Sequence, residues 1–214
     1  QGAPGVQWPW NGDKWYKIPG GLKHIDVGGD GTTWGVNSND DIYRYQGNNN
    51  WQKIDGKLKQ ISVGSAAHAW GVNSGDNIYQ WTGSGWHNVS GKLKHVSVGI
   101  DGTTWGVNSN DDIYRYQGNN SWEKIDGKLK QISVGSAKYI WGVNSSDNIS
   151  FWTGSGWQKV SGALKYVSAS ADGVVWGVNA NDNIYRYRGN NNWQQLTGKL
   201  KQVSVGNVNH VWGV

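Results

Sequence analysis

The chain has 214 residues, with 33 glycines, 16 tryptophans and 10 tyrosines but one phenylalanine and no cysteine. A chain of this length can bury about 70 % of its unfolded surface in one domain, and the absence of cysteine excludes zinc ribbons, iron–sulfur proteins and cysteine hydrolases. The formal net charge of +5 comes from lysines spread along the whole chain, so no basic cluster predicts nucleic-acid binding.

No apolar run approaches the roughly 18 residues that a membrane span needs. Residues 1–9 lack the basic start and the apolar stretch of a signal peptide. We therefore expect a soluble protein with no membrane span, either cytoplasmic or secreted without a visible signal peptide.

Three markers recur along the chain with a period of 35 or 36 residues. Trp-Gly-Val begins at Trp34, Trp70, Trp105, Trp141, Trp176 and Trp212. A second tryptophan series is Trp15, Trp51, Trp86, Trp122, Trp157 and Trp193, and Leu-Lys begins at Leu22, Leu58, Leu93, Leu129, Leu164 and Leu200. Because the three markers agree, the chain consists of six repeats.

Each repeat contains four short strand-like runs, which in the second repeat are residues 60–63, 69–72, 78–81 and 86–89. Clusters of Gly, Asn, Ser and Asp between them indicate turns, and no segment shows helical periodicity. Four strands in about 36 residues are typical of a propeller blade.

The two ends of the chain supply one repeat between them. The sixth repeat stops after two strands at residues 212–214, and residues 7–10 and 15–18 align with the two missing strands. An open solenoid would need polar caps at both ends instead. We therefore predict that residues 1–214 form one all-β domain, a six-bladed β-propeller of four-stranded blades whose last blade is shared by the N- and C-terminal strands.

Alternate repeats differ in their turns. The first, third and fifth carry Asp-Gly at residues 30–31, 101–102 and 172–173, whereas the second and fourth carry Thr-Gly-Ser-Gly at residues 82–85 and 153–156. This superperiod of 71 residues predicts a pseudo-threefold ring of blade pairs.

The tryptophans have two interpretations. In the Trp34 series a large ring is followed by a glycine, which leaves room for a neighbouring blade, so we interpret this series as core. For the outer series, from Trp15 to Trp193, both core packing and ligand contact stay open.

The sequence offers no catalytic constellation. The single glutamate, Glu123, has no repeated carboxylate partner for acid–base chemistry, and no glycine-rich phosphate loop precedes a helix. His24 and His95 are equivalent, with Tyr166 as third member; His68 and His210 are equivalent, with Tyr139 as third member. We expect a ring to hold such residues far apart, and we predict no metal site, no cofactor and no enzyme activity.

The polar residues that recur are more informative. Loops after the second and fourth strands of a blade share one face of a propeller. The recurring residues there are Asn37, Asn73, Asn108, Asn144 and Asn179, then Asp40, Asp76, Asp111, Asp147 and Asp182, then Lys59, Lys94, Lys130, Lys165 and Lys201. The third strands add Tyr45, Trp81, Tyr116, Trp152 and Tyr187.

These four sets have a structural and a functional interpretation. Asn and Asp accept backbone hydrogen bonds in turns, and Lys could pair with Asp across a blade junction. Alternatively, an aromatic face close to fixed polar groups suits a pyranose, which has an apolar face and a ring of hydroxyls. Equivalent weak sites around a ring would then act together, with an avidity gain of about 10²–10⁴.

The repeated Trp-Gly-Val-Asn, Asp-x-Ile-Tyr, following Trp and Leu-Lys-x-Ile-Ser-Val-Gly resemble the tectonin family of β-propeller lectins, most of all its mushroom members. The resemblance covers essentially the whole chain. It implies a protein that binds surface glycans of microbes or invertebrates in innate defence, including lipopolysaccharide and O-methylated sugars of the fucose and mannose type. It also implies a small apolar pocket between blades, lined by tryptophan, valine and glycine.

Two repeats depart from the pattern, and we expect weaker or absent sites there. The fifth reads Ala169-Ser170-Ala171, and the closing repeat has Pro9 and Lys14 in place of the usual residues. The alternative to a multivalent lectin, which we expect to form a homo-oligomer, is a propeller scaffold for protein–protein interaction. The uniformity of the repeats argues against a single protein partner. The even-blade loops with His68, Tyr139 and His210 are a second possible site.

Overall fold

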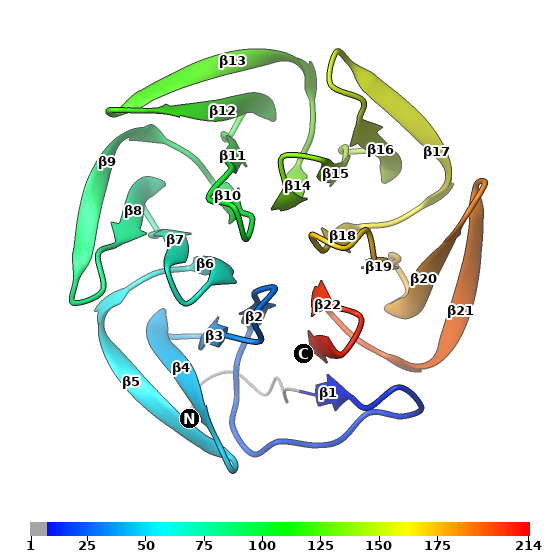
Figure 1. Cartoon of the computed structure of the whole chain (residues 1–214), viewed down its shortest axis with the longest axis horizontal. Helices are drawn as coiled ribbons and strands as arrows, with labels where there is room; N and C mark the ends of the chain where they lie inside the picture. Colours follow the sequence, from blue (N-terminus) through cyan, green and yellow to red (C-terminus); the bar gives the residue numbers. More distant parts are fainter. Residues whose placement is uncertain (1–7) are drawn as a thin grey trace.

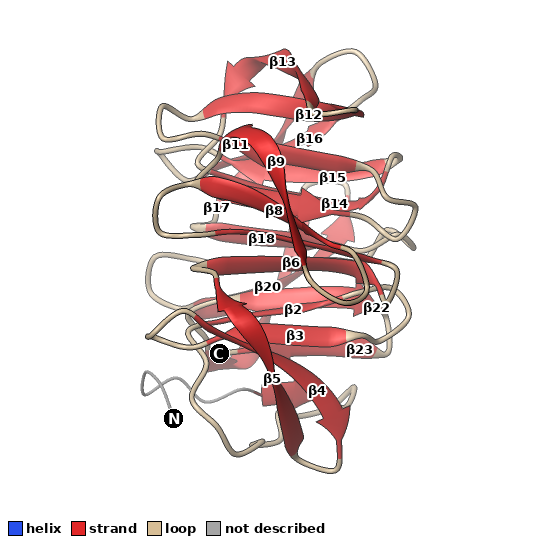
Figure 2. Ribbon diagram, turned by 90° about the vertical axis from the view of Figure 1, so that its left-hand side faces the viewer, coloured by secondary structure: helices blue, strands red, loops and turns tan. Residues whose placement is uncertain are grey.

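The computed structural model describes residues 8–214, which form a closed ring of six β-sheets around a central channel (Figure 1). The prediction of an all-β six-bladed propeller is confirmed. Within each sheet, consecutive strands pair antiparallel from the channel outwards. The loops gather on two opposite faces of the disc (Figure 2).

Five blades are four-stranded and contiguous in the chain. Blade 1 is β2 (His24–Val27), β3 (Thr33–Val36), β4 (Asp41–Gly47) and β5 (Asn50–Lys57). Blade 2 is β6 (Gln60–Ser65), β7 (His68–Val72), β8 (Asn77–Trp81) and β9 (Trp86–Lys92). Blade 3 is β10 (His95–Val98), β11 (Thr104–Val107), β12 (Asp112–Gly118) and β13 (Ser121–Lys128). Blade 4 is β14 (Gln131–Ser136), β15 (Tyr139–Val143), β16 (Asn148–Trp152) and β17 (Trp157–Ala163). Blade 5 is β18 (Tyr166–Ala169), β19 (Val175–Val178), β20 (Asn183–Gly189) and β21 (Asn192–Lys199).

The closing blade combines both ends of the chain, as predicted. It contains β22 (Val203–Asn207), β23 (His210–Gly213) and β1 (Trp8–Trp10), with β1 paired to β23. Residues 15–18 occupy the place of the fourth strand but form only the bridge Trp10↔Trp15. The N–H of Tyr16 donates to the carbonyl of Pro9, and Pro9 has no N–H to return the bond, so this ladder does not extend. Gln7, predicted in this segment, lies outside the described residues.

Burial falls from the channel outwards, in agreement with the residue pattern of each strand. The inner strand β6 is buried at five of six residues, whereas β5 at the rim buries only Ile54 of its eight. The rim strand has one face towards solvent, and most of its residues are polar. The apolar core therefore lies between the blades.

The Trp34 series forms this core, as its sequence pattern predicted. Trp70 of blade 2 is 2 % exposed and packs edge-on against Tyr116 and Trp122 of blade 3, with ring centroids 5.0 and 6.1 Å apart. The glycine that follows each inner tryptophan makes room for a leucine on the opposite face of the strand, since a Cβ on Gly71 would lie 2.4 Å from Leu58 Cδ1. Such edge-to-face contacts stabilise beyond their buried area.

Two kinds of inter-blade junction alternate at the channel. The side-chain amide of Gln60 in blade 2 exchanges two hydrogen bonds with the backbone of Val96 in blade 3, at 2.7 and 2.9 Å. Gln131 and Gln202 repeat this at the other even-to-odd junctions. At two of the odd-to-even junctions the equivalent link is one ring-nitrogen contact, from His24 Nε2 to the Ile61 carbonyl at 3.0 Å and from His95 Nε2 to the Ile132 carbonyl at 3.1 Å. Tyr166 stands at this position in blade 5. The 71-residue superperiod of the sequence thus appears as alternating junctions.

Candidate functional site

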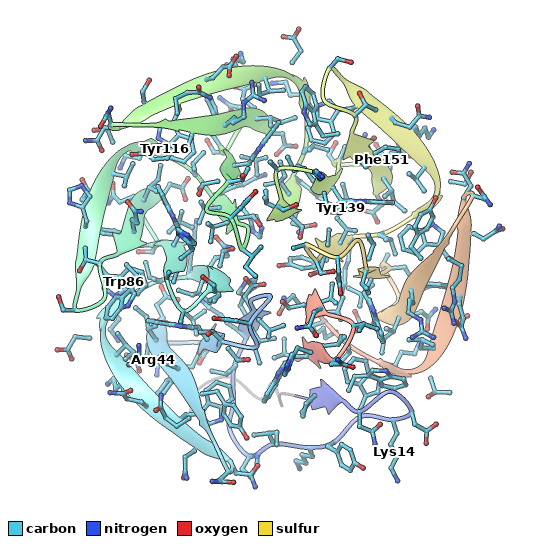
Figure 3. The ribbon with its side chains drawn as sticks, viewed as in Figure 1. Lys14, Arg44, Trp86, Tyr116, Tyr139 and Phe151 are labelled. Carbon is cyan, nitrogen blue, oxygen red and sulfur yellow. The ribbon has the colours of Figure 1, made fainter. Side chains whose placement is uncertain are left out.

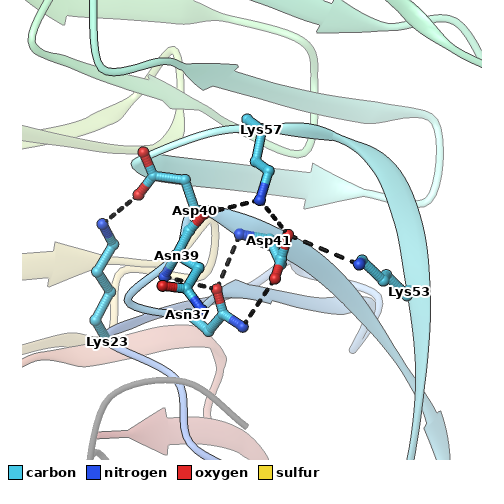
Figure 4. A network of polar contacts seen from close by, with 7 residues as sticks. All are labelled: Lys23, Asn37, Asn39, Asp40, Asp41, Lys53 and Lys57. Carbon is cyan, nitrogen blue, oxygen red and sulfur yellow. Dashed lines mark hydrogen bonds and ion pairs between the residues drawn. The ribbon is translucent and has the colours of Figure 1, made fainter.

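The Asn and Asp that recur in the repeats build one turn in each blade, shown for blade 1 in Figure 4. The Asn37 side-chain oxygen accepts the N–H groups of Asn39 and Asp41 at 3.0 and 2.9 Å. Asp40 adopts a φ of 63°, in the left-handed region that Asn and Asp tolerate, and its carbonyl accepts the N–H of Leu58. Asn73, Asn108, Asn144 and Asn179 make the same two bonds, so this asparagine oxygen is used inside the turn.

The lysines pair with the aspartates of these turns. Lys23 Nζ lies 2.5 Å from Asp40 Oδ1, and the equivalent pairs are Lys59–Asp76, Lys94–Asp111, Lys130–Asp147 and Lys165–Asp182. Each pair lies within one blade, whereas pairing across a junction was expected. Lys201 is the exception, since it reaches from the closing blade to Asp182 of blade 5. Lys165 and then Lys201 hold the pKa of Asp182 below its ordinary value.

The Tyr45 series does not lie beside this polar turn. Tyr45 is five residues beyond Asp40 on an extended strand, a rise of about 16 Å. Its hydroxyl accepts the N–H of Asn49 in the outer hairpin, and its ring packs 4.8 Å from Trp51. Tyr116 and Tyr187 make the same bonds to Asn120 and Asn191. The four predicted sets therefore do not come together as one site, because the aromatic set caps the opposite end of the strand (Figure 3 labels Tyr116).

Cavities lie instead at the junctions between blades. One of about 320 Å³ lies between blades 2 and 3 and is lined by Ile78, Gly91, Lys92, Leu93, Asn108, Tyr114 and Trp122. A second of about 320 Å³ lies at the equivalent place between blades 4 and 5 and is lined by Ile149, Gly162, Ala163, Leu164, Asn179, Tyr185 and Trp193. Of the site residues predicted from the sequence, Asn108 lines the first cavity and Asn179 lines the second.

Each cavity has a fixed aromatic wall. The indole N–H of Trp122 donates to the Ser90 carbonyl at 2.8 Å, which fixes the ring across the junction. Trp193 makes the same bond to Ser161. Gly91, with a φ of 115°, follows Ser90, and a Cβ there would lie 3.3 Å from the indole nitrogen of Trp122. Of the two roles that the sequence left open for the outer tryptophan series, core packing is seen, and Trp122 and Trp193 also line cavities, while ligand contact stays a prediction. Figure 3 shows Trp86, another member of this series, at the rim.

Polar and apolar groups divide each cavity. Ile78 and Leu93 are buried and form an apolar floor, whereas Lys92 is exposed at the rim. In the second cavity the Asn179 Nδ2 lies 3.5 Å from the Tyr185 hydroxyl, which places an amide and a phenol side by side. An aromatic wall, an apolar floor and a few polar groups are typical of small-ligand sites.

The sequence analysis missed the tyrosines of these cavities. Tyr114 and Tyr185 stand two residues before the predicted Tyr116 and Tyr187, on the same face of the strand. Tyr79 is the equivalent between blades 1 and 2, while Ser150 replaces it between blades 3 and 4. The signal that could have found them is their pairing opposite the inner glycines, such as Tyr114 opposite Gly106.

The prediction that the ring holds His24, His95 and Tyr166 far apart is wrong. Their rings converge in the central channel, with centroids 6.0–6.3 Å apart. Desolvation lowers the pKa of His24 to about 4 and that of His95 to about 3, and desolvation also raises the pKa of Tyr166. Within residues 8–214 no group of three or more His, Cys, Asp or Glu side chains could hold a metal ion.

A six-bladed propeller with ligand-sized cavities between its blades defines the class of protein. The tectonin domain family matches residues 7–82, 67–153 and 140–214, so the chain belongs to this family. Tectonin-1 from Physarum polycephalum is 54 % identical over 41 residues, a match that spans 19 % of this chain and 19 % of that protein. Residues 8–214 contain no helix long and apolar enough to cross a membrane.

Solved structures share the fold. A streptogramin B lyase superposes with a TM-score of 0.68 at 15 % identity, over 97 % of this chain and 80 % of that one. The U3-55K structure gives a TM-score of 0.69 at 9 % identity, over 91 % of this chain and 75 % of that one. At these identities the likeness concerns the propeller architecture alone.

Proposed function

We propose that the protein is a multivalent lectin that binds sugars in the cavities between its blades. The observation that carries the proposal is the repeated cavity of Tyr, Trp, Asn and an apolar floor, seen between blades 2 and 3 and again between blades 4 and 5. A pyranose has C–H faces that pack on aromatic rings and hydroxyls that bond to amide and phenol groups.

The resemblance to tectonin lectins supports the finer part of the proposal. The sugars are O-methylated fucose or mannose, or lipopolysaccharide, on microbial or invertebrate surfaces, and the role is innate defence. The apolar side chains of Ile78 and Leu93 offer a surface against which a methyl ether can pack.

Repetition makes weak sites effective. Single contacts of this kind have affinities of about 10⁻⁶–10⁻³ M, and linked sites on a repetitive surface gain about 10²–10⁴. The cavities lie at equivalent junctions of one rigid ring, so a flat array of glycans can engage several at once. A homo-oligomer would present a larger array still.

The first test is a glycan array with 2-O-methyl-L-fucose, O-methylated mannose and lipopolysaccharide, followed by calorimetric stoichiometry on the sugars that bind. Binding of several sugars per chain supports the lectin. No binding to any glycan, together with stoichiometric capture of one protein, would instead favour a propeller scaffold.

A first prediction separates the cavities from the polar turns. Tyr114→Ser and Tyr185→Ser each remove the tyrosine ring and its phenol from one cavity while the tryptophan wall stays, and we expect each to lower the calorimetric stoichiometry by one sugar. Ser150→Tyr should raise it by one, because position 150 pairs with Gly142 as Tyr114 pairs with Gly106. Tyr116→Phe is the matched control and should leave the stoichiometry unchanged. A loss with Tyr116→Phe but not with Tyr114→Ser would place the site at the other end of the strand.

A further inference from the structure

The two cavities differ at one lining position. Ile, Gly, Leu, Asn, Tyr and Trp are shared, but Lys92 stands at the rim between blades 2 and 3 where Ala163 stands between blades 4 and 5. Since the volumes are equal, the difference between the two sites is one of charge. This inference rests on the proposed function.

The lysine at this position has different partners in different blades. Lys57 and Lys128 lie 2.6 Å from the carboxylates of Asp41 and Asp112, which neutralise them. Lys92 instead donates to the amide oxygen of Asn77 at 2.6 Å and to the carbonyl of Gly75 at 3.2 Å. Lys199 repeats this amide arrangement with Asn183 and Asn181.

Lys92 is therefore a cation held in place by neutral groups. Within residues 8–214 it forms no ion pair, in contrast to Lys57 and Lys128. An ammonium group has three N–H donors, and the bonds to Asn77 and Gly75 use two of them. One donor and a full positive charge stay available at the rim of the cavity.

We propose that the cavity between blades 2 and 3 prefers sugars that carry an anionic group, a phosphate or a carboxylate, while the cavity between blades 4 and 5 binds neutral sugars. The aromatic wall holds the sugar ring in both, and Lys92 adds a charge-assisted hydrogen bond in one. Lys159 and Lys165, the basic residues near Ala163 in sequence, are not among the residues that line the second cavity, and Lys165 is paired with Asp182. One chain thus has two kinds of sugar site.

The test reads the two cavities separately in the intact protein. The indole N–H signals of Trp122 and Trp193, assigned with single Trp→Phe variants, report on one cavity each in ¹H–¹⁵N NMR spectra. Mannose and mannose 6-phosphate differ only by the phosphate, and glucose and glucuronic acid serve as the matched pair for a carboxylate.

We expect mannose to shift both indole signals over the same concentration range. Mannose 6-phosphate should shift Trp122 at a concentration about five-fold lower than Trp193, which is the size of a solvent-exposed charge contact. This difference should shrink in 0.5 M NaCl, because salt screens an exposed ion pair. If Trp122 also responds to glucuronic acid at a lower concentration than Trp193 does, negative charge causes the preference. If only mannose 6-phosphate shows this difference, the phosphate group causes it.

Two exchanges complete the test. Lys92→Ala should abolish the preference of Trp122 for the phosphorylated sugar over mannose, and Ala163→Lys should create that preference at Trp193. Lys128→Ala is the control, since Asp112 already neutralises that lysine. Equal responses of both signals to mannose and its phosphate would overturn the inference and leave the lectin standing. No response of either signal to any of these sugars or to 2-O-methyl-L-fucose would overturn both.

Discussion

At the scale of single residues, glycines have two roles: some allow neighbouring backbones to pack closely, and others lie in exposed turns. Gly64 belongs to a ring of inner-strand residues in which neighbouring backbones touch, and a Cβ added there would lie 1.9 Å from the Gly99 carbonyl oxygen. Gly85, in an exposed hairpin, has an ordinary φ and no atom within 4 Å of an added Cβ. The same residue type therefore has different costs of substitution at the two places.

Gly64→Ala should destabilise the protein by about 3 kcal/mol, because the blades must separate to admit the methyl group. Gly85→Ala is the control and should change the free energy of unfolding by less than about 0.5 kcal/mol. Urea unfolding followed by tryptophan fluorescence measures both. Equal stability of the two variants would show that the inner ring tolerates a wider spacing.

The tyrosines of the third strands show how far the sequence predicts the site. The repeats located the third strands and their aromatic residues, yet they could not say which tyrosine of the pair Tyr114 and Tyr116 lines a cavity. Both point to the same face of β12, and only the way in which blade 2 packs on that face decides which of them lines a cavity. The asparagines were identified because they repeat, although their side-chain oxygen serves the turn.

At the scale of an element, the inner strands share one polar layer in the channel. Ser62, Ser97, Ser133, Ser168 and Ser204 each accept a backbone N–H of the next blade at 2.8–3.0 Å. Asp26 of β2 replaces the sixth serine and accepts the N–H of Val63 at 2.6 Å. Desolvation raises the pKa of Asp26 to about 7, so this strand contains a carboxyl group that ionises only near neutral pH.

Asp26→Ser should stabilise the protein above pH 7. The unfolded chain ionises Asp26 near pH 3.8 and the folded chain near 7, so folding stability falls as pH rises between these values. The serine variant lacks this loss, and its advantage over the parent should grow by about 4 kcal/mol from pH 4 to pH 8. Denaturation curves at both pH values measure it, with exposed Asp13→Ser as control. A pH-independent difference would contradict the assignment.

The histidines of the same channel act in the opposite direction. Their folded pKa values of about 4 and about 3 lie below the ordinary 6.5, so stability is lost as pH falls from 6.5. Sequence reasoning paired His24, His95 and Tyr166 correctly as equivalents but misjudged their separation. Inner strands of six blades surround a narrow channel, and side chains from alternate blades meet at its axis.

At the scale of the whole molecule, the ring is closed by a short segment. β1 pairs with β23, and Trp10 packs 5.0 Å from Trp15 and 5.7 Å from Trp176 of blade 5. The repeats predicted this closure, since residues 7–18 align with the missing strands. They could not predict that the fourth strand forms only a bridge, which depends on Pro9.

Trp10→Ala should lower the free energy of unfolding of the entire ring by about 3 kcal/mol, because it removes the aromatic contact that joins the closing blade to blade 5. Tyr16→Ala is the matched control, since Tyr16 is 48 % exposed, and it should cost less than about 1 kcal/mol. Thermal unfolding monitored by near-UV circular dichroism compares them. If Trp10→Ala melted only a minor fraction of the signal, closure would be local.

Glutamine junctions alternate with junctions that have His24, His95 or Tyr166 at the equivalent position, and this alternation sets the unit by which such a ring can grow or shrink. Gln60 meets Val96 through two bonds, and His24 meets Ile61 through one. Duplication or deletion of 71 residues, which is two blades, preserves this order at every junction. Gain or loss of a single repeat places two blades of the same kind side by side, so that two junctions of one type become neighbours. Gain or loss of two-blade units is therefore the change in blade number that keeps the alternation of junctions.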